Sequence, residues 1–265
     1  MCNVQDHLTQ HSLLQALQAE GLGDRLSAVY LEEIDSTNQE AKRRILAGNL
    51  GASLVVAGRQ SAGRGRMGRS FYSPEGSGVY CTLALEVHAS MERAVSLTGA
   101  AAVAVMRSIR RLTGVQTAIK WVNDLYFEGK KVCGILAESL SLPEDPTRRF
   151  LVLGIGVNWY GATFPEELSD VAGSVGAEGA DRAALIAGIC REIIPFLQNA
   201  EDRSWLEDYR RHSCVLGKRV RWSCGDEVAE GSAVDVDGDG ALLVKTDGGE
   251  LMHLRTGEIS LRVVE

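Results

Sequence analysis

The chain has 265 residues, of which 45% are apolar, and a formal net charge of −7. This length can bury a substantial core and divide into more than one domain, and the acidic balance gives no global field that favours nucleic acid or an anionic membrane. No apolar run approaches the ~20 residues of a spanning helix, and the N-terminus lacks the pattern of a signal peptide, so we expect a cytoplasmic protein with no membrane partner.

Cysteine and histidine usage narrows the kinds of site. Six cysteines are scattered without a C-x-x-C pair, and the histidines show no H-x-x-x-H or H-E-x-x-H spacing. This argues against a disulfide framework, a thiolate zinc site and a histidine-centred metal or hydrolase site. We therefore predict reduced, mostly packed thiols and no protein-ligated metal.

The first half of the chain alternates helical and extended patterns. Thr37 with Glu40 three residues later predicts a capping box, and apolar periodicity follows it. A glycine- and arginine-rich loop separates two strand-like runs further along. The predicted elements here are helices at 9–20, 37–47 and 91–112, strands at 53–57 and 79–87, and a loop at 58–78.

The second half begins with strands, among which Glu128-Gly129 predicts a hairpin turn. Two helices follow, the first with Pro195 near its end. After Leu216-Gly217, short strands alternate with Gly/Asp turns, which is typical of a small barrel. The predicted strands are 117–122, 125–127, 131–138 and 150–157, the helices 181–198 and 204–211, and the barrel strands 218–222, 227–234, 241–246, 251–254 and 259–263.

These elements predict an α+β protein in which a mixed β-sheet is flanked by helices and followed by a small C-terminal antiparallel β-barrel. We place the boundaries so that 1–27 is a short N-terminal helical extension, 28–212 is the main domain and 213–265 is the barrel.

The densest chemical signal lies between residues 58 and 69, where four arginines occur among twelve residues, with glycines at 63, 65 and 68. Glycines let the backbone approach a ligand closely, and guanidinium groups grip carboxylate or phosphate oxygens in two-point geometry. The alternatives are a flexible solvated loop and an RNA-binding arginine–glycine tract, which usually repeats over a longer length. A single copy between two strands favours ligand binding.

Two further segments carry polar residues at strand ends. Lys131 opens a strand of small and apolar residues, where its charge can face a reacting phosphate, and Asp124 can meet the same ligand or a magnesium ion. Asn158 follows two glycines at a strand end and can recognise an adenine edge. Taken singly, Lys131 is better explained as an exposed hairpin lysine than as a ligand contact, and asparagine commonly ends a strand without binding anything.

Together these segments resemble the biotin protein ligase family. The motifs, in the family's order, are Ser36-Thr37-Asn38, Gly63-Arg64-Gly65-Arg66-x-Gly68, Lys120-Trp121-x-Asn123-Asp124, Lys131-x-x-Gly134-Ile135 and Gly154-x-Gly156-x-Asn158. The resemblance covers residue 36 to the C-terminus, including the small Src-homology-type barrel that closes the family's chains. It implies a class II synthetase-like catalytic domain that activates biotin with ATP as biotinyl-5′-adenylate and transfers it to a lysine of a biotin carboxyl carrier protein.

The resemblance also implies roles for single residues. Asp124 matches the carboxylate placed where the acceptor lysine arrives, and it joins Lys131, Arg64 and Arg66 as the expected catalytic set. The expected biotin contacts are Ser36, Thr37, Asn38, Gln60, Arg64, Gly65, Arg66, Lys131 and Gly134. The expected nucleotide contacts are Arg66, Arg69, Phe71, Asn123, Lys131 and Asn158.

The chemistry explains why such residues are needed. The biotin carboxylate and the ATP α-phosphate repel each other, so the site must supply cations, namely Arg64, Arg66, Lys131 and Mg²⁺. The resulting mixed anhydride hydrolyses if water reaches it, so we expect the arginine loop and a second segment near residues 159–175 to close over it.

Three positions depart from the family pattern. Val122 stands where proline is usual, Phe71 where tryptophan often follows the arginine loop, and Cys133 where a small residue such as alanine is usual. They leave the chemistry intact, but we expect them to alter lid packing or, at Cys133, sensitivity of the thiol.

Two other functions remain open. Lipoate ligases share the adenylation logic and the fold type, although the G-R-G-R-x-G loop favours the biotin branch. Some family members are biotin-sensing repressors with a winged helix-turn-helix, but the 35 residues before Ser36 hold one credible helix, so we expect a monofunctional ligase without specific DNA binding. A homodimer is compatible with the sequence.

Overall fold

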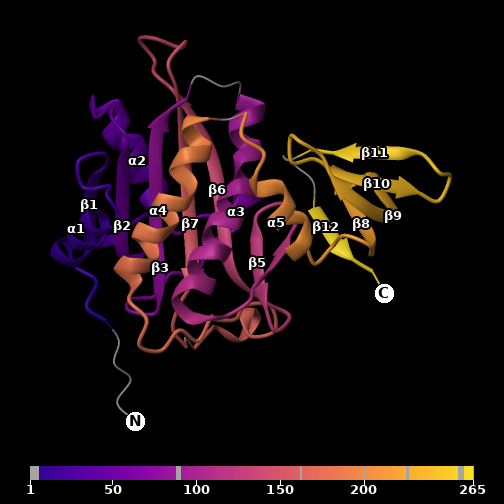
Figure 1. The fold of residues 1–265 in the computed structure, drawn as a ribbon, viewed down its shortest axis with the longest axis horizontal. Coiled ribbons are helices and arrows are strands. Elements are labelled where there is room, and N and C mark those ends of the chain that lie inside the picture. The colour runs from indigo at the N-terminus through magenta and orange to yellow at the C-terminus, as the bar shows by residue number, and fades with distance from the viewer. Residues whose placement is uncertain are drawn as a thin grey trace.

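The structure, a computed structural model, describes residues 6–87, 91–161, 163–199, 201–224, 227–255 and 260–264. A larger α/β body and a smaller β-sheet lie side by side (Figure 1). The helices are α1 (Gln10–Ala19), α2 (Thr37–Leu46), α3 (Met91–Thr113), α4 (Arg182–Gln198) and α5 (Trp205–His212). The strands of the larger body are β1 (Ser27–Ile34), β2 (Ser53–Gln60), β3 (Gly78–Glu86), β4 (Ala118–Lys120), β5 (Asp124–Phe127), β6 (Lys130–Ser141) and β7 (Arg149–Asn158).

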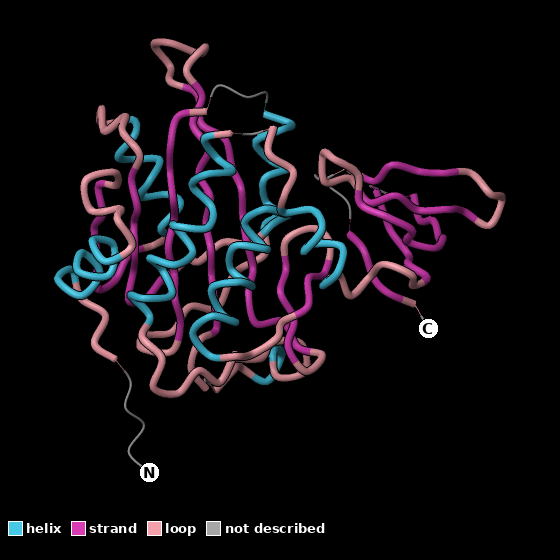
Figure 2. Tube along the Cα trace, in the orientation of Figure 1, coloured by secondary structure: helices cyan, strands magenta, loops and turns pink. Residues whose placement is uncertain are grey.

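These seven strands form one mixed sheet in the order β1-β2-β3-β7-β6-β5-β4. β1 pairs with β2 in parallel, and the other neighbours are antiparallel. The predicted α+β class, with a mixed sheet flanked by helices, is confirmed (Figure 2).

The two faces of this sheet carry separate cores, because successive side chains of a strand point to opposite faces. Leu54 and Val56 of β2 belong to the large core that includes α1, α3 and α4, whereas Val55 between them belongs to a small core under α2. β7 repeats the pattern, with Leu151 and Leu153 on the first side and Val152 on the second. Among the described helices, α2 is therefore the one that packs on this face of the sheet.

Beside the N-terminus of α2, the sheet carries glycines in place of large side chains. Directly opposite residues in antiparallel strands share a face, and the register puts Gly156 opposite Gly134, and Gly154 opposite both Thr82 and Leu136. Because Val152 on the same face lies under α2, the glycines two and four residues further along β7 form an open floor beside it.

The C-terminal region is a five-stranded antiparallel sheet in the order β11-β10-β9-β8-β12. Its strands are β8 (Arg219–Cys224), β9 (Glu227–Val236), β10 (Leu242–Thr246), β11 (Leu251–Leu254) and β12 (Ser260–Val263). Ile259, the predicted start of the last strand, lies outside the described residues. Within the described ranges no pairing of β11 with β12 closes this sheet into a ring.

This small sheet is attached to the larger body by buried and exposed polar contacts. The indole Nε1 of Trp121 donates to the carbonyl oxygen of Gly240 at 3.0 Å in a buried position, and Arg210 of α5 pairs with Asp235 at 2.7 Å. The tyrosine hydroxyl of Tyr209 donates to the carbonyl oxygen of Val122 at 3.0 Å. The turn that carries Trp121 and Val122 is thus held from two sides.

Several predictions need correction. The strand β1 was missed, because it contains Glu32-Glu33 before its last residue and its burial follows no clean alternation. The capping box at Thr37 is wrong: Ser36 precedes the helix without a side-chain cap, and Glu40 pairs with arginines on its own helix. The strand predicted at 117–122 is shorter, because 121–123 form a turn.

Two further predictions are confirmed, and one about a cysteine is not. The hairpin turn has Glu128 at φ 49° and Gly129 at φ 77°, the left-handed pair that a tight two-residue turn requires. Cys133 is fully buried, so the expected thiol sensitivity is not borne out: burial raises its pKa, and a buried thiol is inert. The cysteines at 81, 133, 190 and 214 are free, in accord with the predicted thiols.

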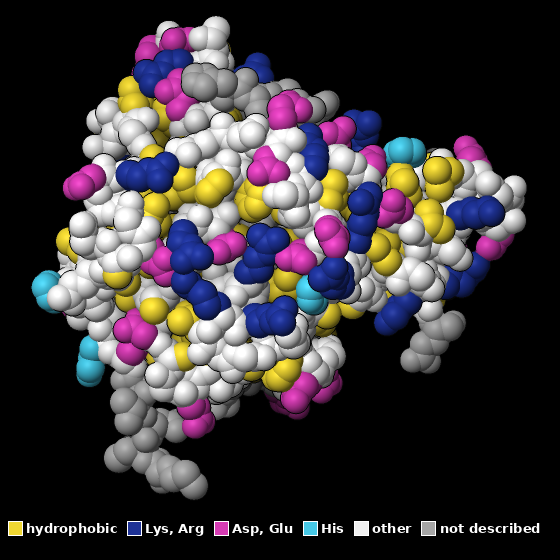
Figure 3. Space-filling view, in the orientation of Figure 1, with side chains coloured by type: hydrophobic (Ala, Val, Ile, Leu, Met, Phe, Trp, Pro, Cys, Tyr) yellow, Lys and Arg dark blue, Asp and Glu magenta, His cyan; other side chains and the backbone are white. Residues whose placement is uncertain are grey.

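The surface agrees with the acidic but mixed composition. Lys and Arg side chains alternate with Asp and Glu over the face that carries α3 and α4 (Figure 3). Arg107, for example, lies 3.5 Å from Glu192 and 2.8 Å from Asp208. No described helix has the length and hydropathy needed to cross a membrane.

Candidate active site

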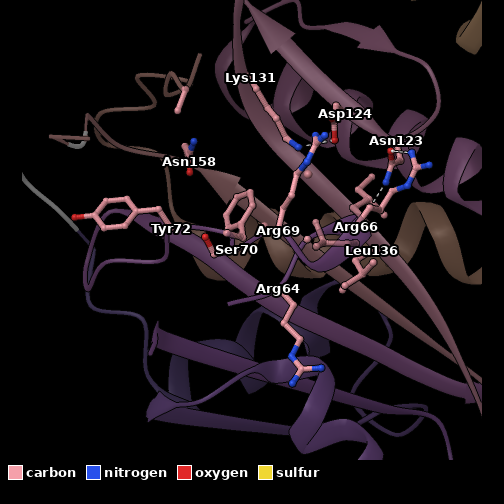
Figure 4. A pocket seen from close by; sticks show the side chains of 18 of the residues that line it. Arg64, Arg66, Arg69, Ser70, Tyr72, Asn123, Asp124, Lys131, Leu136 and Asn158 are labelled. Atoms are coloured by element: carbon pink, nitrogen blue, oxygen red, sulfur yellow. Dashed lines mark hydrogen bonds and ion pairs between the residues drawn. The ribbon is translucent and has the colours of Figure 1, made fainter. Parts of the chain in front are cut away.

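A pocket of about 820 Å³ lies over the glycine floor beside α2 (Figure 4). This volume suits a small molecule or cofactor. Its walls come from the loop between β2 and β3, the N-terminus of α2, strands β4 to β7, residues 164–172 and the C-terminal sheet. Every residue that the sequence assigned to the site lines it: Ser36, Thr37, Asn38, Gln60, Arg64, Gly65, Arg66, Arg69, Phe71, Asn123, Asp124, Lys131, Gly134 and Asn158.

The floor is flat because two glycines lie under an aromatic ring. A Cβ atom added to Gly156 would approach the Phe71 ring to 2.6 Å, and one added to Gly134 would approach it to 3.3 Å. The same ring packs edge-on against Tyr80, with centroids 6.5 Å apart. The glycines therefore let the loop carry Phe71 down onto the sheet.

One end of the pocket is built from neutral polar groups. The side-chain oxygen of Gln60 accepts from the Thr37 amide at 2.9 Å and from its hydroxyl at 3.1 Å, and the Gln60 amide donates to Ser73 Oγ at 2.9 Å. The buried Thr82 hydroxyl donates to Asn38 Oδ1 at 2.6 Å. These groups are fixed before any ligand arrives.

The other end is charged. Lys131 Nζ lies 2.7 Å from Asp124 Oδ1, and its aliphatic chain passes over Gly134, where an added Cβ would come within 3.1 Å of Nζ. Arg69 points toward the same pair (Figure 4). Gly134, directly opposite Asp124 in the register, thus clears the path along which the lysine reaches the carboxylate.

Arg66 reaches this charged end from the loop. Its Nη1 donates to the Asn123 side-chain oxygen at 3.3 Å, and the Asn123 amide donates to the carbonyl oxygen of Ile135. Burial lowers the pKa of Arg66, which the nearby charge of Asp124 partly offsets. Asn123 therefore anchors a partly desolvated guanidinium to β6.

Arg64 lies elsewhere. Its guanidinium points away from Lys131 and Asp124 toward α2 (Figure 4). There Gln39, with its amide oxygen facing the loop, accepts from both Nη1 and Nη2 of Arg64 at 3.0 Å. The structure thus brings Arg66, Arg69 and Lys131 together and separates Arg64 from them.

The segment predicted to act as a second lid lies along β6. The Lys131 amide donates to the carbonyl oxygen of Val171, and the Gly173 amide donates to that of Lys131, both at 2.9 Å. The Asn158 side-chain amide donates to the carbonyl oxygen of Gly173 at 2.8 Å. This segment touches the arginine loop through the rings of Tyr72 and Phe164, whose centroids are 6.3 Å apart.

Comparison with known proteins bears directly on this site. Residues 30–158 match the Biotin/lipoate A/B protein ligase family, and residues 215–262 match the Biotin protein ligase C terminal domain. The chain is 35% identical to the bifunctional ligase/repressor BirA of Bacillus subtilis over 91% of its own length and 76% of that protein. It is 32% identical to the biotin–(acetyl-CoA-carboxylase) ligase of Mycobacterium tuberculosis, over 94% of this chain and 96% of that protein. The chain belongs to the biotin protein ligase family.

A solved member of the biotin protein ligase family shares the fold. The ligase of Aquifex aeolicus, in complex with biotin and ATP, superposes with a TM-score of 0.74 at 28% identity, over 90% of this chain and 99% of that one. The family match includes the small C-terminal sheet, whose residues Leu261, Arg262 and Val263 line the pocket.

Behind the pocket of this biotin protein ligase lie polar residues that the sequence did not predict. Thr82 and Glu138 hold Asn38 from behind, and Lys42 holds Glu138. Thr82 sits in an apolar strand with no turn or charge nearby to single it out. Glu138 shares a face of β6 with Gly134 and Leu136, but its local sequence does not show that this face meets Asn38.

Proposed function

We propose that the protein uses ATP to join biotin to a biotin carboxyl carrier protein of a carboxylase. The observation that carries this is one pocket with a neutral hydrogen-bonding end and a cationic end, separated by a glycine floor. A bicyclic urea with an acidic tail needs such a division, because its ring donates and accepts hydrogen bonds while its carboxylate must meet a phosphate. The relatives named as biotin ligases support the same assignment.

In the first step a biotin carboxylate oxygen attacks the α-phosphorus of ATP, and diphosphate leaves with the electrons of the broken P–O bond. Arg66, Lys131 and Arg69 face the place where negative charge gathers and oppose the repulsion between the two anions. Lys131 leaves Asp124 for the new anion, which frees the carboxylate for the next step.

In the second step the acceptor lysine amine of the carrier attacks the acyl carbon of biotinyl-5′-adenylate, and AMP leaves. Asp124, released from Lys131, accepts the proton that the amine must lose. Asp124 lies 2.7 Å from Lys131, one of the cations assigned to the acyl phosphate, which supports its role where the amine arrives.

Magnesium enters with the nucleotide in this scheme. Asp124 is the single acidic side chain among the described residues that line the pocket, and no group of three His, Cys, Asp or Glu able to hold a metal occurs in the described ranges. Mg²⁺ is commonly held by substrate phosphates with one or two carboxylates. One carboxylate beside a triphosphate fits that pattern.

The nucleotide base is assigned to the side of the pocket where Phe71 and Asn158 lie. Asn158 now donates to Gly173, so binding of adenine exchanges that bond for one to the base. The Tyr72–Phe164 contact lets the arginine loop and residues 159–175 close together over the adenylate, which keeps water from the anhydride.

The related functions predict different outcomes. A lipoate ligase would accept a ring without N–H groups, which leaves a hydrogen-bond acceptor such as the Thr37 hydroxyl oxygen without a donor from the ligand. We further propose the cytoplasm as the location, in keeping with the free cysteines. Specific DNA binding is not expected, and sedimentation with and without biotin and ATP will show whether a homodimer forms.

The deciding experiment supplies ATP, magnesium, biotin and a biotin carrier domain, and follows the mass of the carrier. We expect the mass gain of one biotin, dependent on every component. A parallel reaction with lipoate should give none, and modification by lipoate instead of biotin would overturn the proposal.

A further inference from the structure

A chain of polar groups runs beneath the neutral end of the pocket, starting from a carboxylate that does not line it. Glu138 of β6 accepts from Lys42 Nζ at 2.6 Å through one oxygen and from the Asn38 amide at 2.8 Å through the other. The register puts it opposite Val152, on the face that α2 covers. Its side chain is 25% exposed and that of Lys42 is 20% exposed.

The carboxylate fixes the direction of every bond that follows. An ionised carboxylate only accepts hydrogen bonds, so the NH₂ group of Asn38 must face Glu138 and its oxygen must face Thr82. The Thr82 hydroxyl therefore donates to Asn38 Oδ1, at 2.6 Å. Burial opposes the charge on Glu138, but the hydrogen bonds from Lys42 and Asn38 outweigh it and lower its pKa.

The direction is passed on to the residue that faces the ligand. Thr82 Oγ lies 2.8 Å from the Thr37 hydroxyl, but its single proton is already given to Asn38. Thr37 therefore directs its own proton inward, to Thr82 or to Gln60 Oε1. What Thr37 offers to the pocket is a lone pair, which accepts an N–H from a ligand.

Thr82 is completely buried, and hydroxyl groups inside a sheet carry a desolvation cost unless they are paired. If this position only had to fill space in the core, valine would serve as well as threonine. A buried, directed chain that ends on pocket-lining residues points to recognition and not to fold.

We propose that Glu138 is a positioning residue that fixes the polarity of the chain through Asn38, Thr82 and Thr37, and thereby selects a ligand ring that presents N–H donors, such as the cyclic urea of biotin. This inference rests on the proposed function. In a Glu138→Gln variant the side chain can donate as well as accept, so Asn38 can turn over. The Thr82 hydroxyl can then donate to Thr37 and occupy the lone pair that the ligand needs.

The test measures KM for biotin and for ATP, with kcat, in wild type and in Glu138→Gln and Thr82→Val. Both variants should weaken the hydrogen bond from the ligand N–H to the Thr37 hydroxyl oxygen. Loss of this bond should raise KM for biotin by about 10-fold, while KM for ATP and kcat change less than about twofold. Dethiobiotin, which keeps the urea and lacks the thioether, should suffer the same factor.

Glu86→Gln is the matched control, because Glu86 lies on the same face of the sheet, is 26% exposed and pairs with Arg148 at 2.6 Å. Its KM for biotin should not change. A Glu138→Gln enzyme that matches this control, or that loses ATP and biotin affinity equally, overturns the inference. A wild-type chain that makes no biotinyl-adenylate sinks the proposed function instead, so the two failures are distinguishable.

Discussion

At the neutral end of the pocket the polar groups already hydrogen-bond to one another, whereas at the charged end Lys131 pairs with the Asp124 carboxylate and Arg66 donates to the Asn123 amide oxygen. Gln60 and Thr37 need not rearrange to meet a ring, but Lys131 must leave Asp124 to meet an acyl phosphate. The two ends thus separate recognition, which is fixed in advance, from chemistry, which begins by exchanging one ion pair for another.

The largest effect should come from the charged end. We expect Arg66→Ala and Lys131→Ala each to lower the rate of biotinyl-adenylate synthesis by ~10²–10³-fold, because each removes a cation from the developing charge. Biotin-dependent exchange of diphosphate into ATP measures this step. Arg59→Ala, on the exposed end of β2 beside Glu33, is the control and should keep full activity. If Lys131→Ala made biotinyl-adenylate at the wild-type rate, the charged end would not be the part of the pocket that carries the chemistry.

The floor that joins the two ends should be the next most sensitive part. Gly156→Ala puts a Cβ within 2.6 Å of the Phe71 ring, which must then move off the sheet. We expect the affinity for ATP, whose base is assigned to the side of Phe71, to fall by about 10-fold, the equivalent of ~1.4 kcal/mol. Calorimetric titration measures it. Gly51→Ala, where an added Cβ meets nothing within 4 Å, should bind as wild type does. Equal affinity in both variants would show that the ring position is unimportant.

A smaller effect should follow from the link between the charged end and the C-terminal sheet. Trp121→Phe leaves the buried Gly240 carbonyl oxygen unpaired, which should cost about 1–3 kcal/mol of unfolding free energy and raise KM for ATP. Urea denaturation and ATP kinetics measure the two effects.

Trp205→Phe is the control for that variant, because its buried indole N–H has no hydrogen-bond partner within the described structure. It removes a similar ring without removing a hydrogen bond. If it raises KM for ATP as much as Trp121→Phe does, the bond to Gly240 does not support the Asn123-Asp124 turn.

The smallest effect should be on protein stability, through the carboxylate of Asp35 next to the neutral end of the pocket. The hydrogen bonds from Arg43 lower the pKa of Asp35 to about 2, and Asp35 also accepts from the Ser36 amide at the start of α2. A depressed folded-state pKa adds stability above the unfolded value of about 4, and this is lost as pH falls toward 2. The stability difference between wild type and Asp35→Asn should therefore shrink between pH 5 and pH 2. A difference that stays constant with pH would contradict it.

The sequence predicted which residues form the site better than it predicted how their side chains are arranged. Motif order placed Lys131, Asp124 and Asn158 around one ligand, since those spacings are typical of the family. It could not show that Arg64 turns toward Gln39, because a loop arginine's direction depends on which neighbours accept from it. Thr82 and Glu138 were missed because their roles arise from strand register, which no local pattern encodes. The edge strand β1 was missed because it is half exposed and carries two acidic residues near its end.

The backbone amide of Lys131 also reports on the motion of the segment that covers the pocket. Its amide proton is donated to Val171 of the segment that covers the pocket. That proton can exchange with heavy water only while the segment is away from β6. The exchange rate of the Lys131 amide proton therefore reports how often the segment that covers the pocket opens. This rate, followed with biotin and a non-hydrolysable ATP analogue added in turn, would time the access of the carrier lysine without any label.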